Sequence, residues 1–162
     1  MDKKLHELIN AQINKELYSA YAYYFVAEYY RAKGLLGFHS WFEKQASEEM
    51  EHAEKFSEYL QDQGESVTLF SIEVLKENFK DYRDPLLFQI KHEKEVTASI
   101  IAIYRLASEL EDITTTNFLD WFITEQAEEE KHSKDLLFKY DLFAKDGGLG
   151  LYQLDRELSA RK

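Results

Sequence analysis

Carboxylate and imidazole side chains recur at helical spacing in two stretches of this chain. Glu49 precedes His52 by three residues, and Glu129 precedes His132 by the same interval. Three residues make nearly one turn of an α-helix, so each pair can present an oxygen and a nitrogen donor on one helix face. A single glutamate stands upstream of each pair: Glu16 in the first half and Glu93 in the second. The two halves of the chain therefore carry the same set of metal-binding side chains.

This set of donors favours iron. Hard carboxylate oxygens with one or two imidazoles suit iron, and a glutamate can bridge two ions through its two oxygens. One glutamate from each of two helices, with Glu-x-x-His from each of two others, is the ligand set of di-iron carboxylate bundles. A single Glu-x-x-His on a charged helix is usually a solvated surface. The interpretation therefore depends on all four segments agreeing in register.

Four long helices and a short one are predicted to position these donors. The chain has one proline and six glycines, and such a scarcity of breakers favours long helices. The predicted helices cover residues 4–33, 38–63, 84–111, 116–145 and 149–159. Their predicted core residues recur mostly every three or four positions: Leu5, Ile9, Ile13, Ala20, Tyr24 and Ala27; Phe38, Phe42, Phe56, Tyr59 and Leu60; Leu86, Ile90, Ile100, Tyr104 and Ala107; Phe118, Phe122, Leu136, Tyr140 and Phe143.

The connections predict how the helices are arranged. Gly34 and Gly64 can end the first two helices, and Asp84-Pro85 is typical of a helix start. Residues 64–83 lack helical periodicity and must span the bundle, about 30 Å, so that the third helix can start at its far end. One long crossover is typical of a ferritin-like bundle. We therefore predict one all-α domain over residues 1–162, a four-helix bundle with a long crossover and a short fifth, C-terminal helix.

Composition excludes several classes of function. The chain has no cysteine, which rules out disulfides, thiolate zinc sites and iron–sulfur clusters. A net charge of −11 argues against nucleic acid as a partner and suits cations, although it can also serve solubility alone. The polar beginning of the chain does not resemble a secretory signal, and no apolar run reaches the about 18 residues of a membrane span. A cytoplasmic protein with no membrane association is expected.

The predicted core stripes are each interrupted by a carboxylate. Glu16, Glu49, Glu93 and Glu129 fall between apolar positions, with Gln126 one turn before the last. Burying a carboxylate alone is costly, and a pair of divalent cations would offset that cost. The alternative is a non-catalytic bundle, or a shell that holds other cations. Buried glutamates without metal would then need protonation or ion pairing, and no lysine or arginine is evident in the core to provide it.

Several segments then resemble bacterial non-haem ferritins. They are NKELYSAYAYY, QASEEMEHAEKF, KHEKEVTASI, NFLDWFITEQAEEEKH and GLGLYQLDREL, and the resemblance covers nearly the whole chain. It implies a first iron site of Glu16, Glu49 and His52. A second site would use Glu49 as a bridge together with Glu93 and Glu129, with Gln126 nearby.

The resemblance implies more than these two sites. A third, inner-surface iron site would use Glu48, Glu125 and Glu128, with Glu129 shared. The expected activity is oxidation of Fe(II) by O2 or H2O2 at two iron ions per subunit, with a possible third. Family membership also implies a hollow homo-oligomer of 24 subunits that stores ferric mineral.

Two residues depart from the pattern or are ambiguous. His132 stands where bacterioferritins have a second imidazole ligand and most non-haem ferritins an apolar residue. It either reaches iron or is a surface histidine beside Lys131. Met50 stands where bacterioferritins present methionine to haem, but non-haem ferritins can also have methionine there. The 36-residue spacing from Glu93 to Glu129 resembles non-haem ferritin, so haem is not expected.

Two further expectations concern Tyr23 and the last helix. Tyr23 lies two turns after Glu16 on the same face, so it either packs in the core with its hydroxyl on a carboxylate or takes part in redox chemistry. Three leucines of the short last helix, Leu151, Leu154 and Leu158, are expected to pack around a symmetry axis of an oligomer. A rubrerythrin-like or bacterioferritin-like oxidase or peroxidase without mineral storage is the rival function.

Overall fold

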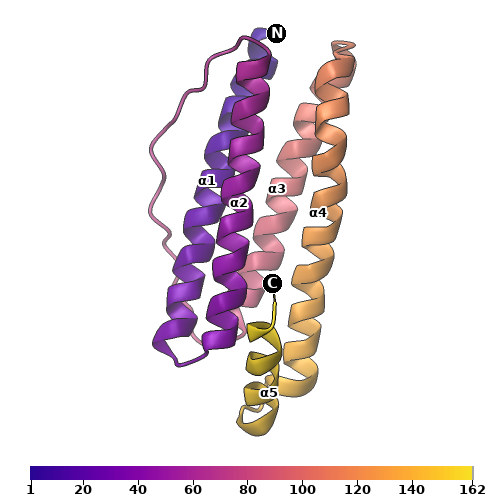
Figure 1. Ribbon diagram of the computed structural model, residues 1–162. Coiled ribbons are helices and arrows are strands. Elements are labelled where there is room, and N and C mark those ends of the chain that lie inside the picture. Colours follow the sequence, from indigo (N-terminus) through magenta and orange to yellow (C-terminus); the bar gives the residue numbers. More distant parts are fainter. Residues whose placement is uncertain (162) are drawn as a thin grey trace.

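The computed structural model describes residues 1–161 and is built of helices. Its elements are α1 (Lys3–Ala32), α2 (Leu36–Asp62), α3 (Asp84–Glu109), α4 (Ile113–Lys139), the π-helical turn η1 (Tyr140–Ala144) and α5 (Gly148–Ser159). The four long helices lie side by side in a bundle, and α5 packs at the end where α2 begins and α4 ends (Figure 1). In the described part of the chain, no helix combines the length and apolar character needed to cross a membrane.

Aspartate side chains cap the starts of α1 and α4. The Asp2 carboxylate accepts hydrogen bonds from the backbone N–H groups of Lys4 and Leu5 and so caps α1, and Asp112 caps α4 through the N–H of Thr115. The turn after α1 contains Gly34 at a φ of 77°, a left-handed conformation that a side chain would strain. Short α1–α2 and α3–α4 connections make two antiparallel hairpins, as predicted.

Residues 63–83 cross the length of the bundle against the side of α1 (Figure 1). Asn10 and Asn14 bind its first part, because their side-chain oxygens accept from the N–H groups of Thr68 and Phe70, both at 2.7 Å. Two residues before α3 begins, the crossover is held again, where the Tyr30 hydroxyl donates to the carbonyl oxygen of Tyr82 at 2.7 Å. The predicted crossover topology is thereby confirmed.

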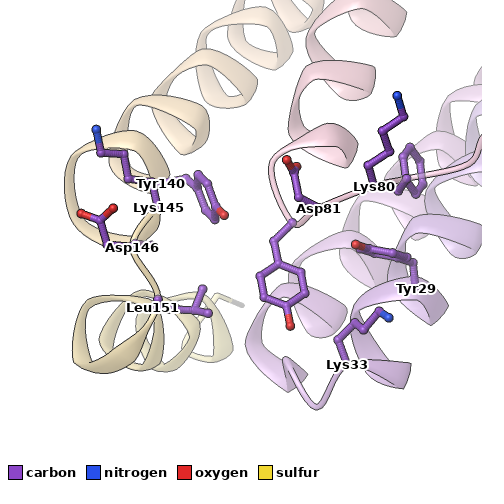
Figure 2. A pocket seen from close by; sticks show the side chains of 12 residues that line it. Tyr29, Lys33, Lys80, Asp81, Tyr140, Lys145, Asp146 and Leu151 are labelled. Carbon is purple, nitrogen blue, oxygen red and sulfur yellow. The ribbon is translucent and has the colours of Figure 1, made fainter.

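The crossover, η1 and α5 meet around a hollow at one end of the bundle (Figure 2). Tyr29 and Lys33 line it from α1, Asp81 from the crossover, and Tyr140 from η1. Nearby, the Arg83 guanidinium makes two hydrogen bonds to the Asp141 carboxylate, at 2.7 and 2.9 Å. This hollow lies outside the group of buried carboxylates described below.

Two hydrophobic clusters fill the bundle. One contains Tyr23, Phe42, Leu86 and Leu136, and the other contains Ile13, Phe56, Val96, Ile100 and Phe122, among others. Along each long helix, the predicted metal-binding residues fall between the members of the two clusters. The fold therefore sandwiches a buried polar layer between two apolar ones.

Three expectations about packing were wrong. Tyr24 is 54% exposed and Phe143 is 63% exposed, although both were expected in the core. Leu154 and Leu158 are already buried within the single chain, with side chains 3% and 7% exposed, and both belong to the cluster around Tyr23. Leu151 packs against the same cluster, so these leucines do not need a symmetry axis to be buried. The last predicted helix of the bundle also starts earlier, at Ile113, and gives way to η1 after Lys139.

Candidate metal centre

Six predicted ligands and Tyr23 lie buried in the polar layer. Each long helix contributes: Glu16 and Tyr23 from α1, Glu49 and His52 from α2, Glu93 from α3, and Gln126 and Glu129 from α4. A soluble protein rarely buries one glutamate completely, and this bundle buries four. The helical register that the sequence predicted is the reason, because each glutamate follows the inward-facing stripe of its helix.

Glu16, Glu49 and His52 form the tightest group. One donor atom from each lies within 4.8 Å of the other two, which is close enough to hold a single ion. The Nδ1 atom of His52 lies 3.2 Å from Oε2 of Glu49. Burial lowers the pKa of His52 to about 4, so its imidazole is neutral at pH 7 and offers a lone pair to a metal.

Two oxygen atoms of this group have no hydrogen-bond partner. They are Oε2 of Glu16 and Oε1 of Glu49, both fully buried. Leaving a buried acceptor unpaired costs about 1–3 kcal/mol, so native structures rarely tolerate it without reason. A cation between the two carboxylates would satisfy both oxygens, and the residues present therefore fit a metal site.

The carboxylates of Glu93, Glu129 and Glu16 accept hydrogen bonds from neighbouring side chains. Oε1 of Glu93 accepts from the Tyr23 hydroxyl, and Oε2 of Glu93 accepts from Nε2 of Gln126 at 3.1 Å. Oε2 of Glu129 accepts from Nε2 of Gln45 at 2.8 Å. On the opposite side, Nε2 of Gln12 donates to Oε1 of Glu16 at 2.6 Å. Such partners orient ligand oxygens and strengthen metal binding.

The metal-free carboxyl groups have high proton affinity. Burial raises the pKa of Glu16 to about 7, and burial with the charge of Glu93 raises that of Glu129 to about 8. The pKa values of Glu49 and Glu93 are raised for the same first reason, that of Glu49 well above its ordinary range. Protons thus relieve the repulsion among these groups until a cation replaces them.

The three residues of the predicted third site lie beside this layer, toward solvent. Glu48 and Glu125 are half-buried and Glu128 is exposed. Burial raises the pKa of Glu125, and the charges of Glu128 and Glu48 raise it further. Oε1 of Glu125 lies 3.8 Å from Nε2 of His52, so this group adjoins the buried one.

Two predicted or possible ligands lie apart from the buried group. His132 is exposed and borders an apolar groove with Trp41 and Leu158. Met50 is exposed on α2. Sequence reasoning missed Gln12 and Gln45, which touch the ligands directly. Each precedes a ligand glutamate by four residues, and so does the buried Gln89 before Glu93. That recurring spacing is the signal that could have found them.

Comparison with known proteins decides the family. Residues 6–143 match the model of the ferritin-like domain. The chain belongs to the ferritin family. It is 33% identical over 156 residues to the bacterial non-heme ferritin of Campylobacter jejuni, covering 96% of this chain and 93% of that protein. It is 31% identical over 161 residues to that of Staphylococcus aureus, covering 99% and 96%.

Solved structures agree with this assignment. A crystal structure of an open pore ferritin from the archaeon Archaeoglobus fulgidus is similar to this ferritin over 100% of the chain, with a TM-score of 0.96 and 35% identity, and 99% of that protein is covered. An engineered closed form of the A. fulgidus ferritin gives the same TM-score. The predicted fold class and the predicted resemblance to non-haem ferritins are both confirmed.

Proposed function

We propose that this ferritin oxidises Fe(II) to Fe(III) at a pair of iron sites in the bundle and stores the product in an oligomeric shell. The observation that carries the proposal is the buried layer of four glutamates and one histidine, with two carboxylate oxygens that lack any partner. The similarity to ferritins supports iron as the substrate.

Each side chain has a defined role in the proposal. Glu16 and His52 hold the first Fe(II), Glu93 and Glu129 hold the second, and Glu49 touches both. Anionic oxygen ligands stabilise the ferric product more than the ferrous substrate, because it carries more charge. Each Fe(II) loses one electron, and one O2 or H2O2 molecule takes the pair. Gln126 and Tyr23 keep Glu93 in place.

The cluster of Glu48, Glu125 and Glu128 is proposed as a weaker third site. This cluster contains no histidine and lies partly in solvent, so it should exchange iron faster than the two buried iron sites. In this proposal it receives ferric iron on its way to the mineral in the cavity of a cytoplasmic shell of 24 subunits. His132 is retained as a weak candidate ligand only for this outer region.

Replacing Glu49 tests the buried site. Glu49→Ala should abolish the rapid oxidation of the first two Fe(II) equivalents, because the residue that touches both ions is lost. The fold should survive and can even gain stability without metal, because a buried carboxyl group with an unpaired oxygen is removed. Stopped-flow absorbance after an O2 pulse to anaerobically loaded protein measures the rate, and a parallel H2O2 pulse compares the two oxidants.

Glu51→Ala is the matched control. Glu51 lies on the same helix two residues later but is exposed, so its loss should leave the rate and the two-equivalent stoichiometry unchanged. Fast oxidation that persists in Glu49→Ala would refute the assigned site.

A further inference from the structure

Arg161 reaches back from the end of α5 to the neighbourhood of the ligands. Its Nη2 donates to Oε2 of Glu48 at 2.9 Å and to Oε1 of Gln45 at 2.6 Å, and its Nη1 donates to the carbonyl oxygen of Trp41 at 3.1 Å. The guanidinium also lies over the Trp41 ring, 4.5 Å from its centre. Three residues of α2, each one turn or less apart, are thereby held by one cation.

The contact with Gln45 fixes the orientation of its amide. Because Oε1 of Gln45 accepts from Arg161, its Nε2 must point the other way, and there it donates to Oε2 of Glu129 at 2.8 Å. An arginine has no acceptor, so the opposite orientation of the amide would place donor against donor. The chain Arg161–Gln45–Glu129 therefore connects a half-exposed cation to a buried ligand.

The contact with Glu48 places a positive charge where the third site needs a metal. Glu125 is close enough to feel the charges of Glu128, Glu48, His132 and Lys55. The cations that touch Glu48 are Arg161 and Lys44, whose Nζ lies 3.9 Å from Oε1. Of these two, Arg161 has the shorter contact, and its side chain is the less exposed. The guanidinium thus neutralises one of the three carboxylates that the proposed site would use.

We propose that Arg161 is a positioning residue that holds the third site closed until metal arrives: its guanidinium occupies Glu48 in the metal-free protein, and an ion bound by Glu48, Glu125 and Glu128 displaces it. The inference rests on the proposed function, in which these carboxylates bind iron. Displacement would also release Gln45, so filling the third site loosens a hydrogen bond on Glu129. Arg161 makes the third site weaker than its charge alone would allow, and this favours release of iron to the mineral.

Titration with Zn²⁺ by calorimetry tests the idea without redox chemistry. The parent should bind two equivalents tightly and further zinc more weakly. In Arg161→Gln the weaker class should tighten about tenfold, a change of about 1.4 kcal/mol, because the cation that competes for Glu48 is gone. The two tight equivalents should change far less, because the Gln45 amide can still donate to Glu129 without Arg161. Arg161→Lys should tighten the weaker class less, because the charge remains but the fork of donors is lost.

Arg156→Gln is the matched control for net charge. Arg156 lies on α5, five residues before Arg161, and is exposed near the Tyr152 ring rather than Glu48. An equal tightening in this variant, or an unchanged isotherm in Arg161→Gln, would overturn the inference. A parent isotherm without two tightly bound zinc ions would instead contradict the proposed function. That outcome depends on the parent protein alone and is therefore distinct from a failure of the inference about Arg161.

The fluorescence of Trp41 gives an independent readout. In a Trp121→Phe background Trp41 is the single tryptophan, since the chain has two. Its emission should stay constant over the two tight equivalents and change as the weaker class fills, because the guanidinium then leaves its ring. The same background with Arg161→Gln should show no such change. Emission that follows the tight equivalents, or stays constant throughout, would argue that Arg161 only fastens the chain to α2.

Discussion

At the scale of single residues, the centre is a group of acids that bury their charge only when a cation is present. Glu16, Glu49, Glu93 and Glu129 face one another from four helices, and none of the arginines and lysines among residues 1–161 is buried in this layer. Without metal, protons must do the neutralising, which is why burial raises their pKa values. Metal binding should then be an exchange of cations for protons.

This exchange predicts how stability depends on pH. The pKa values of Glu16 and Glu129 are raised to about 7 and about 8, so their contribution to stability is complete below their unfolded value near 4.5 and is lost as pH rises through 7 and 8. The pKa values of His52 and His92 are lowered to about 4, so these residues change stability with pH only below about pH 6.5. The free energy of unfolding of the metal-free protein should therefore fall between pH 6.5 and 8.5.

Urea denaturation of metal-free protein at the two pH values measures this slope. Saturation with Zn²⁺ should flatten it, and zinc binding should release more protons at pH 6.5 than at pH 8.5. Glu16→Gln with Glu129→Gln should flatten the slope without metal. Stability that rises over this interval in the metal-free parent would contradict the assignment of buried, protonated carboxyl groups.

Tyr23 is predicted to act by positioning Glu93. Its hydroxyl donates to Oε1 of Glu93, so Tyr23→Phe should leave that oxygen unpaired and slow the oxidation of Fe(II) by about 10-fold, the lower end of the usual cost of losing such a partner. Tyr30→Phe is the control, because that buried hydroxyl donates to a carbonyl oxygen of the crossover. It should lower stability and leave the rate unchanged. Stopped-flow rates that fall equally in both variants would refute the role.

The sequence predicted which carboxylates are buried in the bundle better than it predicted their hydrogen-bond partners. Glu49 and His52 could be paired because helical spacing fixes which residues share a face. The bonds from Tyr23 to Glu93 and from Gln45 to Glu129 join residues of different helices. Their pairing depends on how the helices rotate and slide against each other, which local spacing does not determine. The contact of Arg161 with Glu48 depends in addition on how α5 folds back.

At the scale of elements, periodicity located the helices but misplaced some of their faces. Tyr24 and Phe143 extended an apolar repeat and were expected inside, yet both are exposed. Phe143 lies in η1, where the π-helical turn shifts the residues that follow off the α-helical face. Aromatic side chains also occur at surfaces that meet other subunits, so hydrophobicity alone does not decide whether such a side chain faces the core or the surface.

Helix α5 stabilises the start of α2. Leu35 at the N-cap of α2 supplies no side-chain bond, but Oδ1 of Asp155 accepts from the N–H groups of Gly37 and Phe38 at 2.9 and 3.0 Å. Asp155→Ala should therefore lower the free energy of unfolding by about 1 kcal/mol, the usual cost of removing a helix cap. Asp155→Asn keeps the acceptor and should lose less. Equal denaturation midpoints for parent and Asp155→Ala would contradict this capping role.

At the scale of the whole molecule, the single chain leaves much apolar surface uncovered. The crossover exposes a nearly continuous series of apolar side chains, with Leu69 66% and Val74 72% exposed and Phe70 and Ile72 beside them. A second exposed group, Phe138, Leu142 and Phe143, borders the groove beside α5. Apolar patches of this kind mark protein–protein interfaces. We therefore predict that these surfaces, rather than the leucines of α5 first expected at a symmetry axis, are the basis for assembly.

We predict that the crossover is an interface in a large closed oligomer. Leu69→Glu with Val74→Glu should break the assembly into smaller species without loss of helical content, because neither side chain is part of the subunit core. Lys76→Glu is the matched control, since it changes the net charge by the same amount at an exposed position of the same segment. Light scattering at micromolar concentration distinguishes the outcomes. A parent that is monomeric or dimeric would refute the shell, and a double variant that assembles like Lys76→Glu would show that the crossover is not the interface.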